Sequence, residues 1–237
     1  MKITRKETIY QLTFLPRLFP VNCYFVNEND GLTLIDAALP YSSKAIIKAS
    51  EAIGKPIVRI ILTHAHEDHV GALDNLKKQF PHIPVYISER DSRLMLGDRS
   101  LNEDEPNTPI RGSVPKKLQT RADIFLKDGD KIGSLLALST PGHTPGSMSF
   151  LDTRNHSCVV GDLFQTRGGI AVSGHVKPLF PFPAMATWNK SITLDSAYKI
   201  RDHKPSLLAT GHGKMLEHPN KKINDAIASC KKSLGFT

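Results

Sequence analysis

Three imidazoles and a carboxylate lie close together in one short run of the chain, Thr63-His64-Ala65-His66-Glu67-Asp68-His69. The run follows Ile57–Leu62, an almost wholly apolar, β-branched segment of the kind found in strands that are buried on both faces. His64 and His66 are two positions apart, so an extended backbone projects both imidazoles to the same side. We therefore expect these two side chains to bind one metal ion.

Asp68 and His69 come one turn later and are left for a second metal ion. The apolar spacing around and after Gly71 predicts a helix, so the backbone bends here and can direct both side chains toward a neighbouring position. Imidazole nitrogen and carboxylate oxygen without thiolate suit Zn²⁺, and they also suit iron or manganese. The alternative interpretation is a polar loop between a strand and a helix, in which the histidines occur by chance.

Further polar clusters come at the ends of other predicted strands. His143 lies in the turn-rich loop Thr140–Ser147, after the apolar segment Leu135–Leu138. Asp162 and His212 each follow another short apolar segment. Open α/β sheets place their functional sites at the carboxyl ends of their strands. The recurrence of metal-binding residue types at such positions is stronger evidence for a site than any single histidine.

In this order, the motifs THxHxDH, PGHTPGS, GD and GHG resemble those of the metallo-β-lactamase superfamily, and most of all its glyoxalase II-like and lactonase-like hydrolases. The resemblance extends from about Asn22 to His212 and implies a dinuclear site in which Asp162 bridges the two metal ions. It implies that one ion is bound by His64, His66 and His143, and the other by Asp68, His69 and His212. All seven positions hold the expected residue types, which favours two metal ions over one.

The length and composition of the chain fit one domain. With 237 residues, of which 40% are hydrophobic, the chain can bury a sizeable core. We expect a metallo-β-lactamase-like domain over residues 1–237. The resemblance implies an α/β fold, a four-layer αβ/βα sandwich in which two mixed β-sheets pack face to face and helices cover their outer faces.

Apolar patterns and turn residues locate the expected elements. The strands are expected near Tyr24–Val26, Leu32–Ile35, Ile57–Leu62, Pro84–Ile87, Asp123–Phe125, Lys131–Leu138, Met148–Leu151, Cys158–Val160 and Leu207–Ala209. The helices are expected near Ser43–Ile53, Val70–Phe80, Ala186–Arg201 and Asn220–Leu234. Ser42 or Ser43 can cap the first helix, Gly54 can close it, and Gly235 follows the last.

Two stretches with many prolines and glycines are not typical of core elements. Asp91–Thr120 is expected to contain a long excursion over the surface. Phe164–Pro183 begins just after Asp162 and ends in an apolar, proline-stiffened run, so we interpret it as a wall or lid of a substrate pocket. The alternative is a packing loop that covers the edge of a sheet. His175 in this stretch is a candidate contact for the substrate.

Asp36 is a candidate for steadying one of the metal-binding imidazoles. It stands at the end of the predicted strand Leu32–Ile35, where the resemblance also implies an aspartate. Metal-bound histidines usually have a hydrogen-bond partner on the far ring nitrogen, and a carboxylate can serve as that partner. A residue in a surface turn is the competing interpretation.

The formal net charge of +8 raises the question of a nucleic-acid partner. The paired lysines lie in separate segments, and aromatic residues do not alternate with them. Nucleic acid is therefore not the expected partner, and attraction of an anionic small-molecule substrate is favoured. The lysine pairs are Lys77-Lys78, Lys116-Lys117, Lys221-Lys222 and Lys231-Lys232.

The sequence favours a cytoplasmic location and no membrane partner. It contains no apolar run of membrane-spanning length, and its beginning lacks the apolar core of a signal peptide. The three widely spaced cysteines, Cys23, Cys158 and Cys230, show no pairing pattern and are expected to be reduced, buried thiols.

Two neighbouring cations predict metal-assisted hydrolysis. Water bound between them loses a proton near neutral pH, and the resulting hydroxide can attack a carbonyl held against one metal ion. A proton shuttled through Asp68 or Asp162 would help the leaving group depart. The chain has neither a Gly-x-Ser-x-Gly motif nor a phosphate-binding P-loop. We therefore expect a hydrolase that uses two zinc ions on a small ester, thioester or lactone.

Other functions of the same fold stay open at this point. A phosphodiesterase or nuclease would use the same ligands on a different substrate. An iron-dependent dioxygenase would use a single iron, which the full set of seven ligands argues against. A non-catalytic metal-binding protein is the remaining alternative. The sequence does not determine the physiological substrate, the resident metal or the oligomeric state.

Overall fold

The first part of the chain forms a mixed seven-stranded sheet. The computed structural model describes residues 1–235. Neighbouring strands run antiparallel from the first to the fourth and parallel from the fourth to the seventh. The strands lie across the sheet in chain order, as β1 (Lys2–Lys6), β2 (Ile9–Phe14), β3 (Val21–Asn27), β4 (Leu32–Ile35), β5 (Ile57–Ile61), β6 (Val85–Ser88) and β7 (Ile124–Leu126).

The second part forms a mixed six-stranded sheet. Its strands, in spatial order, are β15 (Leu216–Glu217), β14 (Leu207–Ala209), β11 (Ser157–Val159), β10 (Met148–Asp152), β9 (Leu135–Ser139) and β8 (Lys131–Ile132). Strands β11 and β14 are parallel, and the other neighbours are antiparallel. A separate hairpin consists of β12 (Phe164–Gln165) and β13 (Ala171–Val172).

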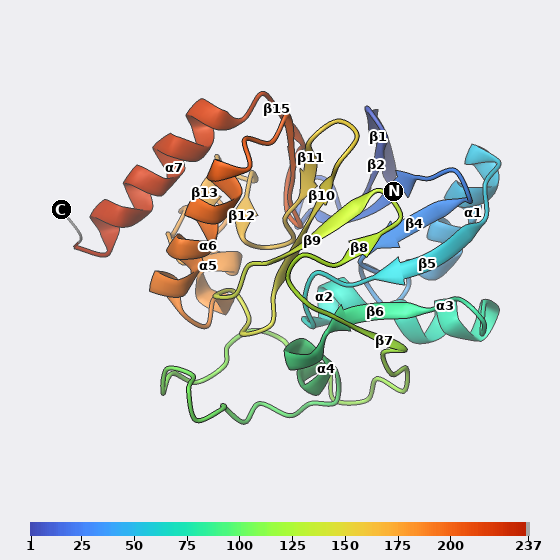
Figure 1. Ribbon diagram of the computed structural model, residues 1–237, viewed down its shortest axis with the longest axis horizontal. Coiled ribbons are helices and arrows are strands. Elements are labelled where there is room, and N and C mark those ends of the chain that lie inside the picture. The colour runs from blue at the N-terminus through green and yellow to red at the C-terminus, as the bar shows by residue number, and fades with distance from the viewer. Residues whose placement is uncertain (236–237) are drawn as a thin grey trace.

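Helices cover the outer faces of the two sheets. They are α1 (Ser43–Ile53), α2 (Glu67–Val70), α3 (Leu73–Gln79), α4 (Glu89–Met95), α5 (Phe182–Ala186), α6 (Lys190–Asp202) and α7 (Asn220–Ser233). Figure 1 shows α1 and α3 beside the blue and cyan strands of the first sheet, and α6 and α7 on the opposite side of the molecule.

Two hydrophobic clusters attach these helices to the sheets. In the first cluster, Ile46 of α1 and Leu73 of α3 are buried together with Leu34 of β4. In the second, Ala197 of α6 and Leu208 of β14 are buried together, along with the apolar face of α7. Each amphipathic helix therefore places one apolar face on a sheet.

A third cluster, the intersheet core, fills the space between the two sheets. It contains Tyr24 and Ile61 from the first sheet and Phe150 and Ala209 from the second. Facing sheets bury the side chains of their inner faces in a shared layer of this kind. The order of layers is thus helices, sheet, sheet, helices, which confirms the predicted α/β four-layer sandwich.

Several elements have the bounds predicted from the sequence. They are Leu32–Ile35, Ser43–Ile53 and Leu207–Ala209. Gly54 closes α1 in the left-handed conformation with φ 78°, as predicted. Ser42 stands at the N-cap, but its side chain makes no capping hydrogen bond, so that prediction is wrong. The short strands β1, β2, β12, β13 and β15 and helix α4 were not predicted.

Three long predicted elements are divided in the structure. The predicted strand Lys131–Leu138 is wrong because Gly133, with φ 58°, turns the chain between β8 and β9, which pair with each other. The predicted helix Val70–Phe80 begins earlier, in α2, and is interrupted before α3. The predicted helix Ala186–Arg201 is interrupted because Thr187 is extended, with φ −76° and ψ 126°.

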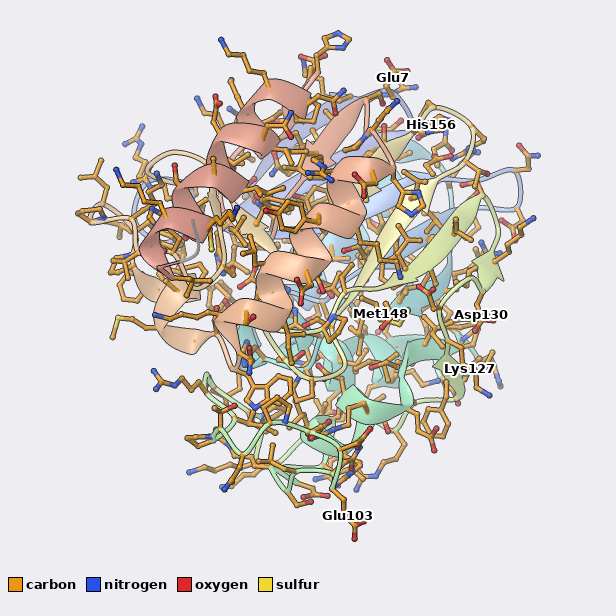
Figure 2. All side chains as sticks on the ribbon, turned by 60° about the vertical axis from the view of Figure 1, so that its left-hand side comes forward. Glu7, Glu103, Lys127, Asp130, Met148 and His156 are labelled. Carbon is orange, nitrogen blue, oxygen red and sulfur yellow. The ribbon has the colours of Figure 1, made fainter. Side chains whose placement is uncertain are left out.

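The predicted surface excursion lies between α4 and β7. Asp91–Met95 belong to α4, and residues 96–123 then contain neither helix nor strand. This segment runs along the lower side of Figure 1, and Figure 2 shows Glu103 pointing away from the body of the molecule. An ion pair between Arg90 and Glu105, 2.6 Å long, holds the segment against α4.

Two further sequence expectations concern cysteines and membranes. Cys23, Cys158 and Cys230 are buried and unpaired, as predicted. Among residues 1–235, no helix has both the length and the apolar character needed to cross a bilayer.

Candidate metal centre

Seven predicted metal-binding side chains converge from both sheets. Four of them follow β5, and the other three follow β9, β11 and β14. All are buried except Asp68, which is partly exposed. In chain order they are His64, His66, Asp68, His69, His143, Asp162 and His212.

Six of these side chains form two groups that share no residue. Within each group, the potential ligand atoms all lie within 4.8 Å of one another. The groups are His64, His66 and His143, and Asp68, His69 and His212; a third group, His64, His69 and Asp162, shares one residue with each of them. The first two groups are the same two sets that the sequence resemblance implies.

Asp162 lies between the two groups. Its Oδ1 is 3.4 Å from His69 Nε2, and its Oδ2 is 3.5 Å from His143 Nε2 and 3.1 Å from His212 Nε2. One carboxylate therefore reaches nitrogen donors of both groups.

Each of the five imidazoles is also held from outside. One ring nitrogen faces the other donors, and the opposite nitrogen has a hydrogen-bond partner in the surrounding protein. Such partners fix the ring orientation and the tautomer of metal-binding histidines. The pairs are His64 Nδ1 with Thr63 Oγ1 (3.0 Å), His66 Nε2 with Arg111 O (3.0 Å), His69 Nδ1 with Asp36 Oδ2 (2.8 Å), His143 Nδ1 with Thr187 Oγ1 (3.2 Å) and His212 Nδ1 with Pro20 O (2.7 Å).

Asp36 makes the contact that its steadying role requires. Its carboxylate accepts hydrogen bonds from the backbone N–H and the hydroxyl of Thr63, both 2.8 Å, and from His69. Its φ of 63° is in the left-handed region, which a residue other than glycine occupies at some cost unless its surroundings hold it there. The three hydrogen bonds provide that restraint and join the end of β4 to the histidine run.

Polar atoms at the centre of the site lack partners of their own. His64 Nε2, His69 Nε2 and Asp162 Oδ1 are buried and make no hydrogen bond. Leaving a buried polar atom unsatisfied costs about 1–3 kcal/mol. A cation among these atoms would remove that cost, and nitrogen and carboxylate donors suit zinc, iron or manganese. The residues present therefore fit bound metal.

Burial and the charge of Asp162 have opposite effects on the imidazoles. Burial lowers the pKa of His64 and of His143. Burial is also the largest single effect on His69 and His212 and acts to lower their pKa, but the neighbouring carboxylates together raise it, those of Asp162, Asp36 and Asp68 for His69 and those of Asp162 and Asp68 for His212. Burial acts to raise the pKa of Asp162, but the nearby imidazoles of His212 and His69 hold it well below its usual range. The lowered pKa of His64 and His143 favours the neutral imidazole that binds metal, and the lowered pKa of Asp162 favours its carboxylate form.

The family model described as the metallo-beta-lactamase superfamily matches residues 16–212 of this sequence. The chain belongs to that superfamily. The match contains all seven of the converging side chains, so the two donor groups lie within the part of the chain that defines the family.

Two proteins of Bacillus subtilis are similar to this chain over most of its length. The chain is 59% identical over 232 residues to the uncharacterized protein YobT of Bacillus subtilis (strain 168), covering 98% of this chain and 100% of YobT. It is 28% identical over 214 residues to the probable metallo-hydrolase YybB of the same organism, covering 87% and 88% of the two chains.

A hydroxyacylglutathione hydrolase of Crocosphaera subtropica (strain ATCC 51142 / BH68) is 27% identical over 143 residues, which are 58% of this chain and 44% of that enzyme. Among solved structures, TTHA1623 in a di-iron-bound form matches with a TM-score of 0.64 and 24% identity, covering 89% of this chain and 96% of the other. The predicted superfamily and its fold are therefore confirmed, and the similarity to a hydroxyacylglutathione hydrolase supports the glyoxalase II-like part of the predicted branch.

The irregular segment 96–123 reaches the metallo-β-lactamase site at Arg111 and Gly112. The Arg111 carbonyl accepts the hydrogen bond from His66 Nε2. Gly112 has φ 83° and lies against the same ring, since a Cβ built on it would be 2.5 Å from Cε1 and closer still to Nε2. The backbone N–H of Glu67 donates to the Ser113 carbonyl at 2.7 Å. These contacts orient His66, and sequence patterns gave no signal for them apart from the glycine.

A cleft of about 750 Å³ opens onto the site. His66, Asp68, Asp162 and His212 contribute to its lining. Phe182 and Pro183, at the end of the stretch interpreted as a pocket wall or lid, line it as well.

The structure does not place His175 with the other site residues. His175 does not line the cleft, and its charged neighbours are Lys177 and Lys190, which with burial lower its pKa. Its backbone N–H donates to the Val172 carbonyl at 3.1 Å, which ties this turn to β13. The stretch Phe164–Pro183 reaches the cleft only at its end, where Phe182 and Pro183 of α5 line it.

Asp91 joins two of the loops that carry imidazoles, and the sequence patterns did not identify it. It lies in α4 and is fully buried. Its carboxylate accepts hydrogen bonds from the backbone N–H of Ala65 (2.9 Å), the hydroxyl of Thr144 (2.7 Å) and the backbone N–H of Gly146 (2.7 Å). Ala65 lies between His64 and His66, and the other two donors flank the turn after His143. Asp91 therefore positions three imidazoles without touching them.

Asp91→Ala is expected to lower the free energy of unfolding by about 3 kcal/mol, because three buried donors lose their acceptor. Turnover should fall as well, since both loops lose their common anchor. Urea denaturation and steady-state kinetics measure the two effects. Asp195→Ala, which removes an exposed carboxylate from α6, is the control and should leave both unchanged. Stability of Asp91→Ala within about 0.5 kcal/mol of the original protein would rule out the anchoring role.

Proposed function

We propose that this protein is a hydrolase with a dinuclear metal site, and that its substrate is a small ester, thioester or lactone. The position of Asp162 carries the proposal, because this carboxylate reaches donors of both groups and its buried Oδ1 makes no hydrogen bond. In the proposed site, one ion is held by His64, His66 and His143, the other by Asp68, His69 and His212, and Asp162 contributes to both.

Bound at these positions, two divalent ions supply an activated water at neutral pH and polarise an electrophilic carbonyl. The protein's own groups position and move protons around that chemistry. Asp68 is partly exposed in the cleft lining, so its carboxylate can accept a proton and pass it to a leaving group. Asp162 and the outer hydrogen bonds of the five imidazoles keep the donors in place, so that little reorganisation is needed during reaction.

Zinc is the proposed resident metal. The donor set of imidazoles and carboxylates without thiolate is common in zinc hydrolases, although it also suits iron or manganese. The probable metallo-hydrolase YybB supports hydrolysis as the reaction type, whereas the di-iron form of TTHA1623 makes iron the metal to test against zinc. No observation favours a phosphodiesterase or a nuclease. The single domain over residues 1–237 and the cytoplasmic location stay predictions.

Removing the metal is expected to abolish hydrolysis. Purified protein should contain about two ions per chain by elemental mass spectrometry, as a two-metal mechanism requires. Dialysis against a chelator should remove the ions together with activity on ester, thioester and lactone substrates, and added zinc should restore both. One iron per chain with oxygen consumption would instead identify a dioxygenase. Metal-loaded protein without activity on any of the three substrate types would contradict the proposal.

His203→Ala is the matched control for these measurements. His203 is partly exposed at the C-cap of α6 and belongs to neither donor group. The variant should retain both its metal content and its activity. A loss of metal in this variant would show that the measured ions bind outside the proposed site.

A further inference from the structure

The cleft at the proposed site is larger and more apolar than a small ester requires. Its volume of about 750 Å³ is in the range of clefts that enclose drug-sized ligands. Besides the metal-site residues, its lining contains the aromatic and aliphatic side chains Phe19, Leu39, Val70, Leu118, Phe182 and Met185.

One wall of the cleft is aromatic and begins at a proposed metal ligand. The ring of Phe19 lies 5.2 Å from the ring of His212 and 5.0 Å from the rings of both Phe180 and Phe182, measured between centroids. Phe180 is buried behind this wall, whereas Phe182 is 50% exposed and Met185 is 63% exposed. Exposed apolar side chains that gather beside a cleft are typical of a binding surface for an apolar ligand. The wall thus leads from the proposed reaction centre toward the solvent.

Another part of the lining is positively charged. Lys116 and Lys117 line the cleft and are exposed, and among residues 1–235 neither lies within 4.0 Å of a carboxylate oxygen. The segment that carries them is held in place by Asp74, which accepts hydrogen bonds from the backbone of Gln119 and Thr120.

Among residues 1–235, the acidic residues of the lining form no ion pair with these lysines, and Asp68 and Asp162 belong to the proposed metal site. Asp74 is engaged by the backbone of the lysine segment itself. The Glu67 carboxylate accepts a hydrogen bond from the Ser113 hydroxyl. The two ammonium groups are therefore free to pair with an anionic ligand.

We propose that the cleft selects an amphipathic acyl ester or thioester, an inference that rests on the proposed hydrolase function. The apolar acyl chain lies along Phe19, Phe182 and Met185, and an anionic group on the other part of the substrate lies at Lys116 and Lys117. Water adds to the acyl carbon, the C–O or C–S bond breaks, and the products are a carboxylic acid and an anionic alcohol or thiol. The apolar wall and the lysine pair thus define the substrate class.

Hydrolysis of a matched ester series tests both parts of the cleft. The series combines acetyl, butyryl, hexanoyl and octanoyl chains with an alcohol that is either neutral or carries a sulfonate. The value of kcat/KM is expected to rise about twofold to fourfold per added methylene. The sulfonated esters should be favoured about threefold to fivefold over the neutral ones.

Two double variants separate these effects. Phe182→Ala with Met185→Ala should reduce the octanoyl-over-acetyl preference at least tenfold while acetyl esters are still hydrolysed. Lys116→Gln with Lys117→Gln should remove the preference for sulfonated esters, because their kcat/KM falls toward that of the neutral esters. The matched controls are Phe125→Ala, which changes a half-exposed phenylalanine on β7, and Lys231→Gln with Lys232→Gln on α7. Both controls should behave like the original protein.

Binding of the apolar anionic dye 8-anilinonaphthalene-1-sulfonate tests the cleft without catalysis. The dye should bind to metal-loaded and metal-free protein, more weakly to each double variant, and unchanged to the controls. Equal dye binding in all variants, or ester hydrolysis that does not depend on chain length or charge, would overturn the inference and leave the hydrolase proposal standing. Dye binding with the expected variant effects but no ester hydrolysis would support the cleft and contradict the hydrolase proposal.

Discussion

Asp162→Ala is expected to reduce the metal content of the purified protein from about two ions per chain to below one, and kcat/KM by about a thousandfold or more. The reason is the position of this carboxylate between two groups of buried imidazoles. Without it, the only carboxylate left in either donor group is that of the partly exposed Asp68. Elemental mass spectrometry and ester hydrolysis measure the two losses.

Folding has to be checked separately for this variant. Circular dichroism should show an unchanged content of helix and strand, because Asp162 lies at the end of β11 and not inside an element. Asp195→Ala, an exposed aspartate on α6, should keep both metal and activity. A folded Asp162→Ala protein that still binds two ions would exclude a shared ligand at this position.

Gly112→Ala is expected to lower kcat/KM at least tenfold and to weaken the metal site that contains His66. The added methyl group would overlap the His66 ring, and the left-handed φ of 83° would be strained as well. The imidazole would have to move away from the Arg111 carbonyl, which holds its outer nitrogen. Metal titration with a chelating dye should therefore show one of the two sites weakened.

Gly129→Ala separates the steric effect from the backbone strain. Gly129 has a nearly identical φ of 88°, but a Cβ at this position would meet no atom within 4 Å. This control should lose some stability without losing metal. If both variants lost the same stability and neither lost metal affinity, Gly112 would matter only for the backbone conformation of its segment.

The sequence patterns that predict the donors are local motifs. His64 and His66 are fixed relative to each other by the two-residue period of extended backbone, and Asp162 and His212 stand where short apolar segments end. Parallel strands bring such ends to one edge, so the convergence follows from the strand order. The resemblance to a family then assigned the donors to two groups, and the structure contains the same groups.

The supporting contacts could not be predicted in this way. Asp91 and the Arg111 carbonyl act on residues 26 and 45 positions away, and backbone atoms carry much of the contact. A hydrogen bond to a backbone atom can be made by almost any residue type, so composition and spacing do not identify it. Gly112 is the one residue of this segment whose type reflects these contacts, because only a glycine fits against the His66 ring. Many glycines in loops have no close neighbour of this kind, so the residue type alone did not identify the contact.

The errors in the predicted fold have a similar cause. The run Lys131–Leu138 is apolar enough for one strand, yet a tight turn at Gly133 folds it into two. The edge strand β1 was missed because its largely exposed and polar residues are stabilised mainly by pairing with β2. The inner strand β2 is mostly buried and was missed as well. Periodicity reports burial, whereas edge strands depend on partners that are distant in the sequence.

The intersheet core connects the two halves of the proposed metal site through side chains that do not line the cleft. The donors on the β5 side belong to one sheet and those after β9, β11 and β14 to the other, so the gap between them is spanned by side chains such as Tyr24 and Phe150. A smaller side chain at position 150 would allow the two sheets to approach each other. A larger one would push them apart. Ion selectivity depends on ligand geometry. The protein could therefore be tuned between zinc and iron by substitutions that leave every ligand in the sequence untouched.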